Sequence, residues 1–192
     1  MSKALLIIDV QNDFTEGGSL GVDGGSAIAA GITRLLAEHG DDYSHVIASR
    51  DWHDAEGDNG GHFAEGEPDY ETTWPVHCVA GTEGAEYHPA LDSARIDVHV
   101  FKGQGAIAYS IFDGTTASGE RFGEVLTELG VTDVDLVGVA TDYCVRASAL
   151  DAIEHGQHVR ILTDLVAAVA PASGEAALAE LAHAGAELVP AP

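Results

Sequence analysis

A continuous apolar run at residues 4–8, which ends at Asp9, sets the tightest limit on the fold. A run this short and unbroken is typical of a strand buried on both faces, as in a parallel sheet covered by helices. Similar strands are predicted at residues 45–49, 97–101, 134–139 and 158–162, with a short edge strand at 187–189. Helical patterns lie between them, so the alternation predicts an α/β fold with a parallel sheet and helices on both sides.

The predicted helices are marked by apolar spacing and by end signals. A first helix closes at Gly40, and others are expected at residues 120–129, from about 141 to 155, and at 174–184 behind a capping Ser173. No repeat or linker divides the chain, so we predict a single domain over residues 1–192. One irregular stretch, from Trp52 to about Arg95, is long enough that a functional role is expected.

Composition excludes several classes of function. Asp and Glu total 32 against 8 Lys and Arg, for a net charge of −24, and such a surface repels nucleic acid and anionic lipid. No apolar run reaches membrane-spanning length, and the first residues do not resemble a secretory signal. Two cysteines give no disulfide framework. We expect a cytoplasmic protein, a monomer or homodimer, whose partner is a small molecule.

Four residues of reactive types follow or end predicted strands: Asp9, Asp51, Lys102 and Cys144. Ligands bind at the carboxyl ends of parallel strands, so these side chains are expected to converge. Cys144 stands at a strand-to-helix turn, where helix N–H groups favour a thiolate and can hold an oxyanion. It is a candidate nucleophile, although many free cysteines are only small buried hydrophobes.

Asp9 and Lys102 are candidate partners of that nucleophile. Asp9 would act as a general base that takes the thiol proton and later protonates a leaving amine, or it would merely anchor a loop. Lys102 would keep Asp9 ionised and stabilise a thiolate, or it would be an ordinary residue at a strand end. Only Lys3 and Lys102 are lysines, in a chain that otherwise uses arginine. The three assignments support one another because thiolate chemistry needs both partners.

A second cluster combines a carboxylate with imidazoles: Asp51, His53, His62 and His77. Asp51 and His53 are two residues apart and face the same side of an extended chain. Such ligands suit one divalent transition metal, zinc, iron or manganese, although loop histidines are often only exposed. We therefore expect a metal-binding loop region at about 51–95. Three aromatic residues in loops beside these clusters, Phe14, Trp74 and Tyr109, predict a pocket for a flat ring.

The sequence resembles the bacterial nicotinamidases (pyrazinamidases) of the isochorismatase-like cysteine hydrolases nearly end to end. The resemblance is carried by these segments: LLIIDVQNDF (5–14), SRDWH (49–53), GHF (61–63), PDYETTWPVHCVAGT (68–82), VFKG (100–103), AYSIF (108–112) and VGVATDYCVRASALDA (137–152). Tyr143 stands where some relatives carry histidine, and residues 103–107 depart from relatives with a more aromatic sequence.

The resemblance implies a doubly wound six-stranded parallel sheet flanked by helices. It implies Asp9, Lys102 and Cys144 as the catalytic trio, a cis peptide between Val139 and Ala140, and an oxyanion hole formed by the N–H groups of Ala140 and Cys144. The resemblance also implies a metal site made by Asp51, His53 and His77. The substrate pocket is predicted to comprise Phe14, Trp74, Tyr109, Val139 and Ala140. The GHF motif matches the branch that adds His62 as a fourth ligand.

The implied activity is hydrolysis of nicotinamide to nicotinic acid and ammonia through a cysteine thioester, in NAD salvage, with pyrazinamide as a second substrate. Within the superfamily, another small amide or a carbamoyl compound is an alternative substrate. The enol ether cleaved by isochorismatases is disfavoured because those enzymes typically lack the nucleophilic cysteine. A non-catalytic metal-binding protein is a further alternative, in which Cys78 joins the ligands and Cys144 belongs to the core.

Overall fold

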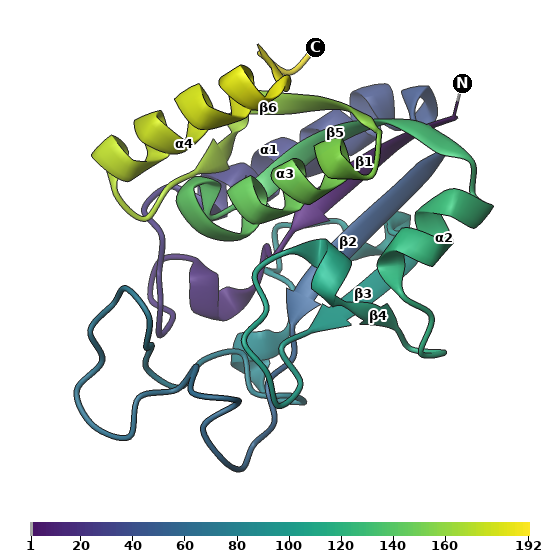
Figure 1. Ribbon diagram of the computed structural model, residues 1–192. Coiled ribbons are helices and arrows are strands. Elements are labelled where there is room, and N and C mark those ends of the chain that lie inside the picture. The colour runs from purple at the N-terminus through teal and green to yellow at the C-terminus, as the bar shows by residue number, and fades with distance from the viewer. Residues whose placement is uncertain (1) are drawn as a thin grey trace.

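The computed structural model describes residues 2–192, which form one seven-stranded sheet with helices on both faces (Figure 1). The strand order is β4-β3-β2-β1-β5-β6-β7. The strands are β1 (Ser2–Ile8), β2 (His45–Asp51), β3 (Val98–Lys102), β4 (Thr115–Thr116), β5 (Val131–Val139), β6 (His158–Ala167) and β7 (Glu187–Val189). All pairs are parallel except β3 with β4. The α/β fold with six parallel strands is therefore confirmed, and β4 adds a two-residue antiparallel edge.

Alternate residues of the buried strands supply two separate cores, one on each face of the sheet. Leu5 and Ile7 of β1 pack on the side of α1 (Gly25–His39), whereas Leu6 and Ile8 pack on the opposite side. That opposite side is covered by α2 (Phe122–Glu128), α3 (Arg146–Glu154) and α4 (Pro171–Ala184). Because β1 is buried on both faces, the unbroken apolar run has its physical explanation.

Two predicted boundaries need correction. The last helix begins at Pro171 and not at residue 174, because proline is well suited to the first helical turn. Ser173 therefore lies inside that turn, where its hydroxyl donates to Asp142 at 2.5 Å, and it does not cap the helix. The helix after β5 opens as a π-helical turn, Thr141–Val145, before α3 begins at Arg146.

The long segment between β2 and β3 contains only two 3-10 turns, Glu83–Ala85 and Ser93–Arg95. It lies beyond the carboxyl ends of the strands, in the blue loops of Figure 1, and isolated bridges tie it down at His53 with Val79 and at Phe63 with Trp74. This places the loop over the edge where the strand-end residues lie. None of the helices in residues 2–192 combines the length and the apolar character needed to cross a membrane.

Candidate active site

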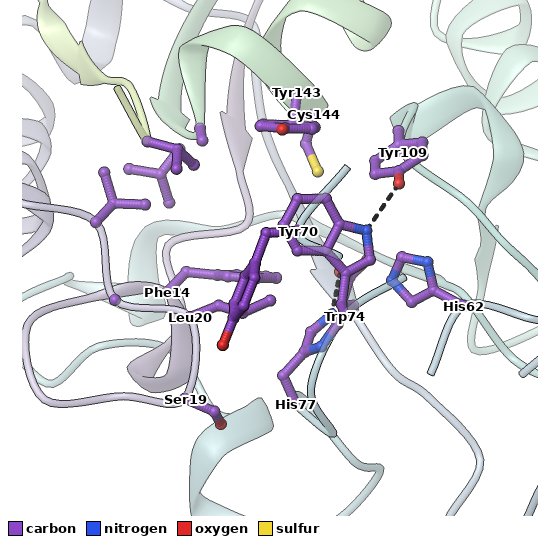
Figure 2. Close-up of a pocket in the computed structure, with 16 residues that line it drawn as sticks. Phe14, Ser19, Leu20, His62, Tyr70, Trp74, His77, Tyr109, Tyr143 and Cys144 are labelled. Carbon is purple, nitrogen blue, oxygen red and sulfur yellow. Dashed lines mark hydrogen bonds and ion pairs between the residues drawn. The ribbon is translucent and has the colours of Figure 1, made fainter. Parts of the chain in front are cut away.

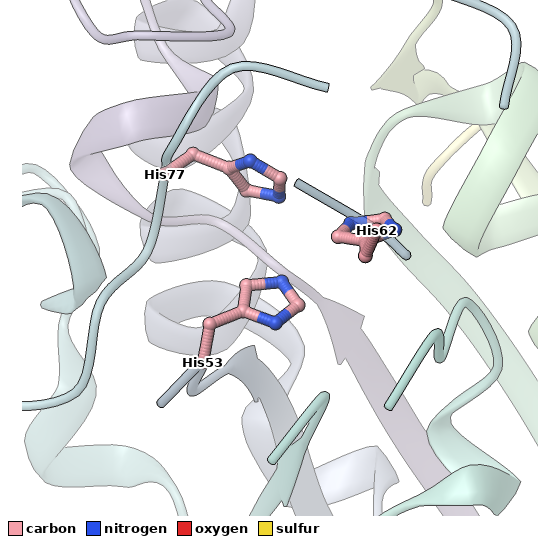
Figure 3. Close-up of side chains that lie close together, drawn as sticks. All are labelled: His53, His62 and His77. Atoms are coloured by element: carbon pink, nitrogen blue, oxygen red, sulfur yellow. The ribbon is translucent and has the colours of Figure 1, made fainter. Parts of the chain in front are cut away.

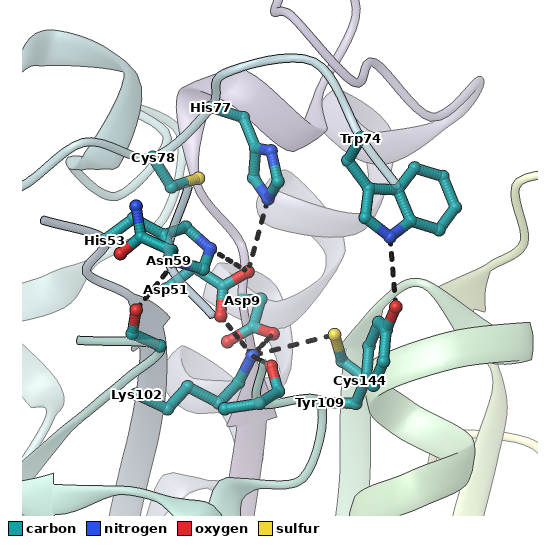
Figure 4. Close-up of polar contacts among 12 residues, drawn as sticks. Asp9, Asp51, His53, Asn59, Trp74, His77, Cys78, Lys102, Tyr109 and Cys144 are labelled. Carbon is teal, nitrogen blue, oxygen red and sulfur yellow. Dashed lines mark hydrogen bonds and ion pairs between the residues drawn. The ribbon is translucent and has the colours of Figure 1, made fainter. Parts of the chain in front are cut away.

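The four strand-end residues meet as expected, and all four are buried. Lys102 lies between the others: its Nζ is 2.9 Å from Asp9 Oδ2, pairs with Asp51 Oδ1 and is 3.7 Å from Cys144 Sγ (Figure 4). The sheet order explains the meeting, since β1 lies between β2 and β5 and β3 lies beside β2. Parallel strands therefore bring residues 42 to 135 positions apart in the sequence to one edge.

Asp9 holds a backbone conformation that is unusual for a residue with a side chain. Its φ is 48°, and the chain turns sharply there, with the Gln11 N–H donating to the Asp9 carbonyl at 2.8 Å. Such a conformation costs about 1–3 kcal/mol and persists only where the surroundings enforce it. Strain of this kind clusters at functional sites, which agrees with a working role for Asp9.

Burial and the single lysine set the charge states of the cluster. Burial raises the pKa of Asp9, although Lys102 opposes the shift. Burial acts the same way on Asp51, but there Lys102 and the neighbouring histidines outweigh it and hold the pKa of this carboxyl well below its usual range. Burial alone would lower the pKa of Lys102, yet the two carboxylates raise it well above its ordinary value. Lys102 is therefore a permanent cation.

Cys144 rests as a thiol, which corrects the expectation that the helix end favours a thiolate. Burial raises the pKa of Cys144 well above its ordinary value, and the nearby Asp9 and Asp51 raise it further. Lys102 opposes the shift without cancelling it. A base must therefore remove the proton when the sulfur attacks, and Asp9 is within the same cluster.

The turn that carries Cys144 follows a cis peptide between Val139 and Ala140, as the resemblance implied. The Ala140 carbonyl accepts from the N–H groups of Tyr143 and Val145, each at 3.1 Å, and these bonds close the π-helical turn. Val139, Ala140 and Cys144 all line one cavity. The assignment of the Ala140 and Cys144 N–H groups to an oxyanion hole stays a prediction.

Three buried histidines form a group whose ligand atoms all lie within 4.8 Å of one another: His53, His62 and His77 (Figure 3). The Nδ1 atoms of His53 and His77 bond to the carbonyls of Gly103 at 2.8 Å and Pro75 at 2.7 Å. Their Nε2 atoms therefore point inward, 3.6 and 3.8 Å from Asp51 Oδ2. A histidine held by a carbonyl at one nitrogen is the usual arrangement of a metal ligand.

Orphaned nitrogens show that these residues fit a divalent metal. Among residues 2–192, His53 Nε2 and His62 Nδ1 are buried side-chain atoms without a hydrogen-bond partner. Burial, aided by the other two histidines, lowers the pKa of His62 to about 3, so its ring is neutral and able to ligate. Cys78 does not join this group; its sulfur contacts the Gly84 carbonyl at 3.9 Å. The alternative ligand set with Cys78 therefore has no support in the geometry.

The cavity beside Cys144 has a volume of about 280 Å³ and is mostly apolar (Figure 2). All five residues predicted for the pocket line it: Phe14, Trp74, Tyr109, Val139 and Ala140. Trp74 Nε1 donates to the Tyr109 hydroxyl at 3.0 Å, and the Tyr143 ring meets the Trp74 ring edge-on at 5.1 Å. A narrow apolar slot with few polar groups suits a flat aromatic ring.

Several residues of the site carried no usable signal in the sequence. The cavity is also lined by side chains from three loops: Leu20, Val22, Tyr70 and Val169. Gln11 also belongs to the site without lining the cavity. Its buried amide donates to the Asp51 carbonyl at 2.9 Å and accepts from the Asp51 N–H at 2.8 Å. An isolated amide that pairs with backbone across 40 positions has no local pattern, so only the fold reveals it.

Comparison with known proteins agrees with this geometry. The Isochorismatase domain model matches residues 3–191. The chain is 49% identical over 187 residues to the nicotinamidase/pyrazinamidase of Mycobacterium tuberculosis, covering 97% of this chain and 98% of that protein. Among solved structures, the pyrazinamidase of Pyrococcus horikoshii in complex with zinc has a TM-score of 0.83 at 34% identity, covering 99% of each chain. PnC1 from L. infantum in complex with nicotinate has a TM-score of 0.84 at 35% identity, covering 98% of this chain and 92% of that one. The chain belongs to the isochorismatase family.

Proposed function

We propose that the protein is an amidohydrolase that converts nicotinamide to nicotinic acid and ammonia, and that it also accepts pyrazinamide. One observation carries the proposal: a single buried lysine contacts both a carboxylate and a thiol, and the thiol lines an aromatic slot. The carboxylate is a base, the thiol is a nucleophile, and the slot fits a pyridine ring. The names of the similar proteins, a nicotinamidase/pyrazinamidase among them, support the same substrate.

Substrate binding follows from the shape of the slot. The pyridine ring lies between Phe14 and Trp74, with its carboxamide carbon toward Cys144. Asp51, His53, His77 and His62 would hold one divalent transition metal, zinc, iron or manganese, and all four are buried. A metal held by these residues would supply a Lewis acid close to the ring nitrogen or to a water beside it, and the four side chains would in this way help to orient the ring. The nucleophile comes from the protein and not from this group.

The first half of the reaction releases ammonia. Asp9 takes the proton of the Cys144 thiol as the sulfur attacks the carboxamide carbon, and Lys102 balances the charge on both partners. The N–H groups of Ala140 and Cys144 stabilise the oxyanion, at about 3 kcal/mol for each donor. Collapse of the tetrahedral intermediate breaks the carbon–nitrogen bond. Asp9 gives its proton to the leaving nitrogen, which departs as ammonia and leaves a thioester on Cys144.

The second half regenerates the enzyme. Asp9, again ionised, removes a proton from a water molecule that attacks the thioester carbon. The oxyanion forms in the same place, and its collapse breaks the carbon–sulfur bond. The proton held by Asp9 returns to the sulfur, so that nicotinic acid leaves and the thiol is restored. In each half of the reaction, Asp9 first accepts a proton and then donates it. One buried carboxylate paired with one lysine is sufficient for both transfers.

An amide panel tests the proposal. Ammonia release is measured with nicotinamide, pyrazinamide, benzamide and a carbamoyl compound, before and after metal removal by a chelator. We expect release from the two ring amides with a ring nitrogen, a smaller rate with benzamide, and loss of activity on chelation that is restored by added metal. Hydrolysis of the carbamoyl compound alone would assign a different substrate, and no release from any amide would overturn the proposal.

A further inference from the structure

Asp9, the proposed base, has a second partner that no sequence pattern marks. Ser49 lies on β2, is completely buried, and donates from its hydroxyl to Asp9 Oδ1 at 2.7 Å. The other carboxylate oxygen, Oδ2, is 2.9 Å from Lys102 Nζ in an ion pair and accepts no hydrogen bond within residues 2–192. The two oxygens of one carboxylate therefore have different surroundings.

The strand register places Ser49 there. Ile7 of β1 pairs with Ala48 of β2, so Ser49 stands one step further, where β1 ends and the chain turns at Asp9. Successive side chains of a strand alternate between faces, which leaves Ala48 in the core on the α1 side. Ser49 faces the opposite way, toward the carboxylate. The contact is thus built by two neighbouring strands and not by a mobile loop.

We propose that Ser49 is a positioning residue for the base: its hydroxyl fixes the rotation of the Asp9 carboxylate so that Oδ2 is the oxygen that receives the Cys144 proton. This inference rests on the proposed function for the role of Asp9. Lys102 Nζ lies 2.9 Å from Asp9 Oδ2 and 3.7 Å from Cys144 Sγ, so this oxygen and the thiol share one cation, whereas Oδ1 is occupied by Ser49. Because Ser49 holds Oδ1, the other oxygen, Oδ2, keeps its position while it accepts and later releases the proton.

A hydroxyl suits this task better than a second cation. It gives one directed hydrogen bond to a carboxylate at the usual charge-assisted length. A second ammonium would add a full positive charge beside Asp9 and weaken it as a base. Without the hydroxyl, the carboxylate can rotate about its terminal bond, and both oxygens then compete for Lys102. Misplacement of a reacting group on this scale costs about tenfold to a hundredfold in rate.

The first test replaces Ser49 by Ala. Turnover of nicotinamide is expected to fall by about tenfold to a hundredfold, with KM changed by no more than about twofold and with metal content unchanged. Ser148→Ala is the matched control, because Ser148 is also completely buried and its hydroxyl also makes a single hydrogen bond, accepted from the Ile111 N–H at 2.9 Å. The control is expected to keep kcat. Equal losses of kcat in the two variants would reduce Ser49 to a structural role.

A second pair of variants separates the effect of the hydrogen bond from any effect of side-chain size on folding. Ser49→Thr and Ser49→Val add the same bulk, and only the first keeps a hydroxyl on the same carbon. Any cost of the extra bulk is common to both, so their difference reports the hydrogen bond alone. We expect the Thr variant to exceed the Val variant in kcat by about tenfold. Equal kcat values for the two would overturn the assignment.

Alkylation of Cys144 gives a readout that needs no substrate. Iodoacetamide labelling, with mass spectrometry to assign the modified cysteine, is expected to be slower in Ser49→Ala than in the parent protein. In an Asp9→Ala background, the same change at Ser49 should have no further effect, since Ser49 acts through Asp9. An equal slowing in both backgrounds would refute the inference. A coupled result in a protein that hydrolyses no amide would instead refute the proposed function and leave the positioning role standing.

Discussion

Two clusters of buried carboxylates lie in the same sheet, and their surroundings differ. In the cluster toward the amino end, Asp135, midway along β5, accepts two hydrogen bonds from Arg160, at 2.8 and 2.7 Å, and one from the Tyr43 hydroxyl at 2.8 Å, and it pairs with Lys3 at 2.7 Å. Two cations serve one carboxylate there. At the carboxyl end, one cation, Lys102, serves the two carboxylates Asp9 and Asp51.

The difference separates a cluster that holds the fold from one that is ready to react. No member of the amino-end cluster has a buried polar atom without a partner in the described part of the chain. In the carboxyl-end cluster, two imidazole nitrogens lack a hydrogen-bond partner, His53 Nε2 and His62 Nδ1, and Asp9 Oδ2 has only its ion pair with Lys102. Each unpaired buried polar atom costs about 1–3 kcal/mol, and a metal bound among the histidines would satisfy both imidazole nitrogens.

The largest effect is expected at the carboxyl end, from Cys144→Ala. Removal of a covalent nucleophile should lower ammonia release by at least about a thousandfold. Metal content, measured on the purified variant, should stay equal to that of the parent, because the histidines are untouched. A variant that retains activity would show that the cluster does not work through its sulfur.

Asp135→Asn should act in the opposite way, on stability and not on turnover. Loss of the carboxylate leaves two cations without a counter-charge, and because both are partly exposed we expect a loss of about 2–3 kcal/mol in the free energy of unfolding. Activity per folded molecule should be unchanged. A fall in kcat without a fall in stability would erase the contrast between the two ends.

The same variant has a defined dependence on pH. Arg160, Lys3 and Tyr43 outweigh burial and lower the pKa of Asp135 below 3.8 in the folded protein. A lowered folded pKa gives stability that is complete above the unfolded value and is lost as the pH falls through the folded value. The difference in unfolding free energy between parent and variant should therefore be constant near neutral pH and shrink below about pH 4.

His62→Ala sharpens the comparison at the metal group. The loss of a supporting partner of a metal ligand commonly costs 10- to 100-fold in affinity, so loss of a ligand should raise the dissociation constant by at least about tenfold. Zinc titration of the metal-free protein measures it. His158→Ala is the control, because His158 lies at the amino end of β6, where its ring nitrogens are 3.6 Å from an Asp133 oxygen and 3.3 Å from a Glu187 oxygen. Unchanged affinity in the His62 variant would restrict the site to Asp51, His53 and His77.

The smallest effect is expected from Arg160→Lys. Lysine keeps the charge beside Asp135 but cannot reproduce the two parallel hydrogen bonds of the guanidinium. Because the Arg160 side chain is 33% exposed, we expect a loss of no more than about 1 kcal/mol, with no change in kcat. Thermal denaturation would detect it, and a larger loss would mean that geometry matters more than charge at this end.

The sequence predicted most of the sheet and the strand-end residues for one reason. Buried parallel strands are apolar and unbroken, so a charged residue at the end of such a run stands out, as Asp9 and Lys102 do. The exceptions lacked a pattern of their own. β4 has two residues, too few for any periodicity to register. Tyr70 and Val169 meet in the pocket only because two loops fold toward it.

Local chemistry also had limits as a guide to Cys144. A helix end favours a thiolate, and that part of the reasoning is sound. The opposing influences on the pKa of Cys144, burial and two carboxylates, depend on neighbours far away in the sequence. Ser49 escaped notice for the same reason, because its contact with Asp9 spans 40 positions. The atoms that surround a residue are determined by the fold, so their effect on its pKa and its contacts cannot be read from the local sequence.

The enclosure of Lys102 makes the protein easy to orient. The chain has two lysines, and the Lys102 side chain is 0% exposed whereas that of Lys3 is 27% exposed. A reagent that couples to lysine amines from solvent therefore reaches Lys3 and not the cluster. Lys3 lies at the start of β1, a seven-residue strand whose far end leads into Asp9, about 20 Å away. A molecule tethered to a surface through this lysine would present its reactive edge to the solution.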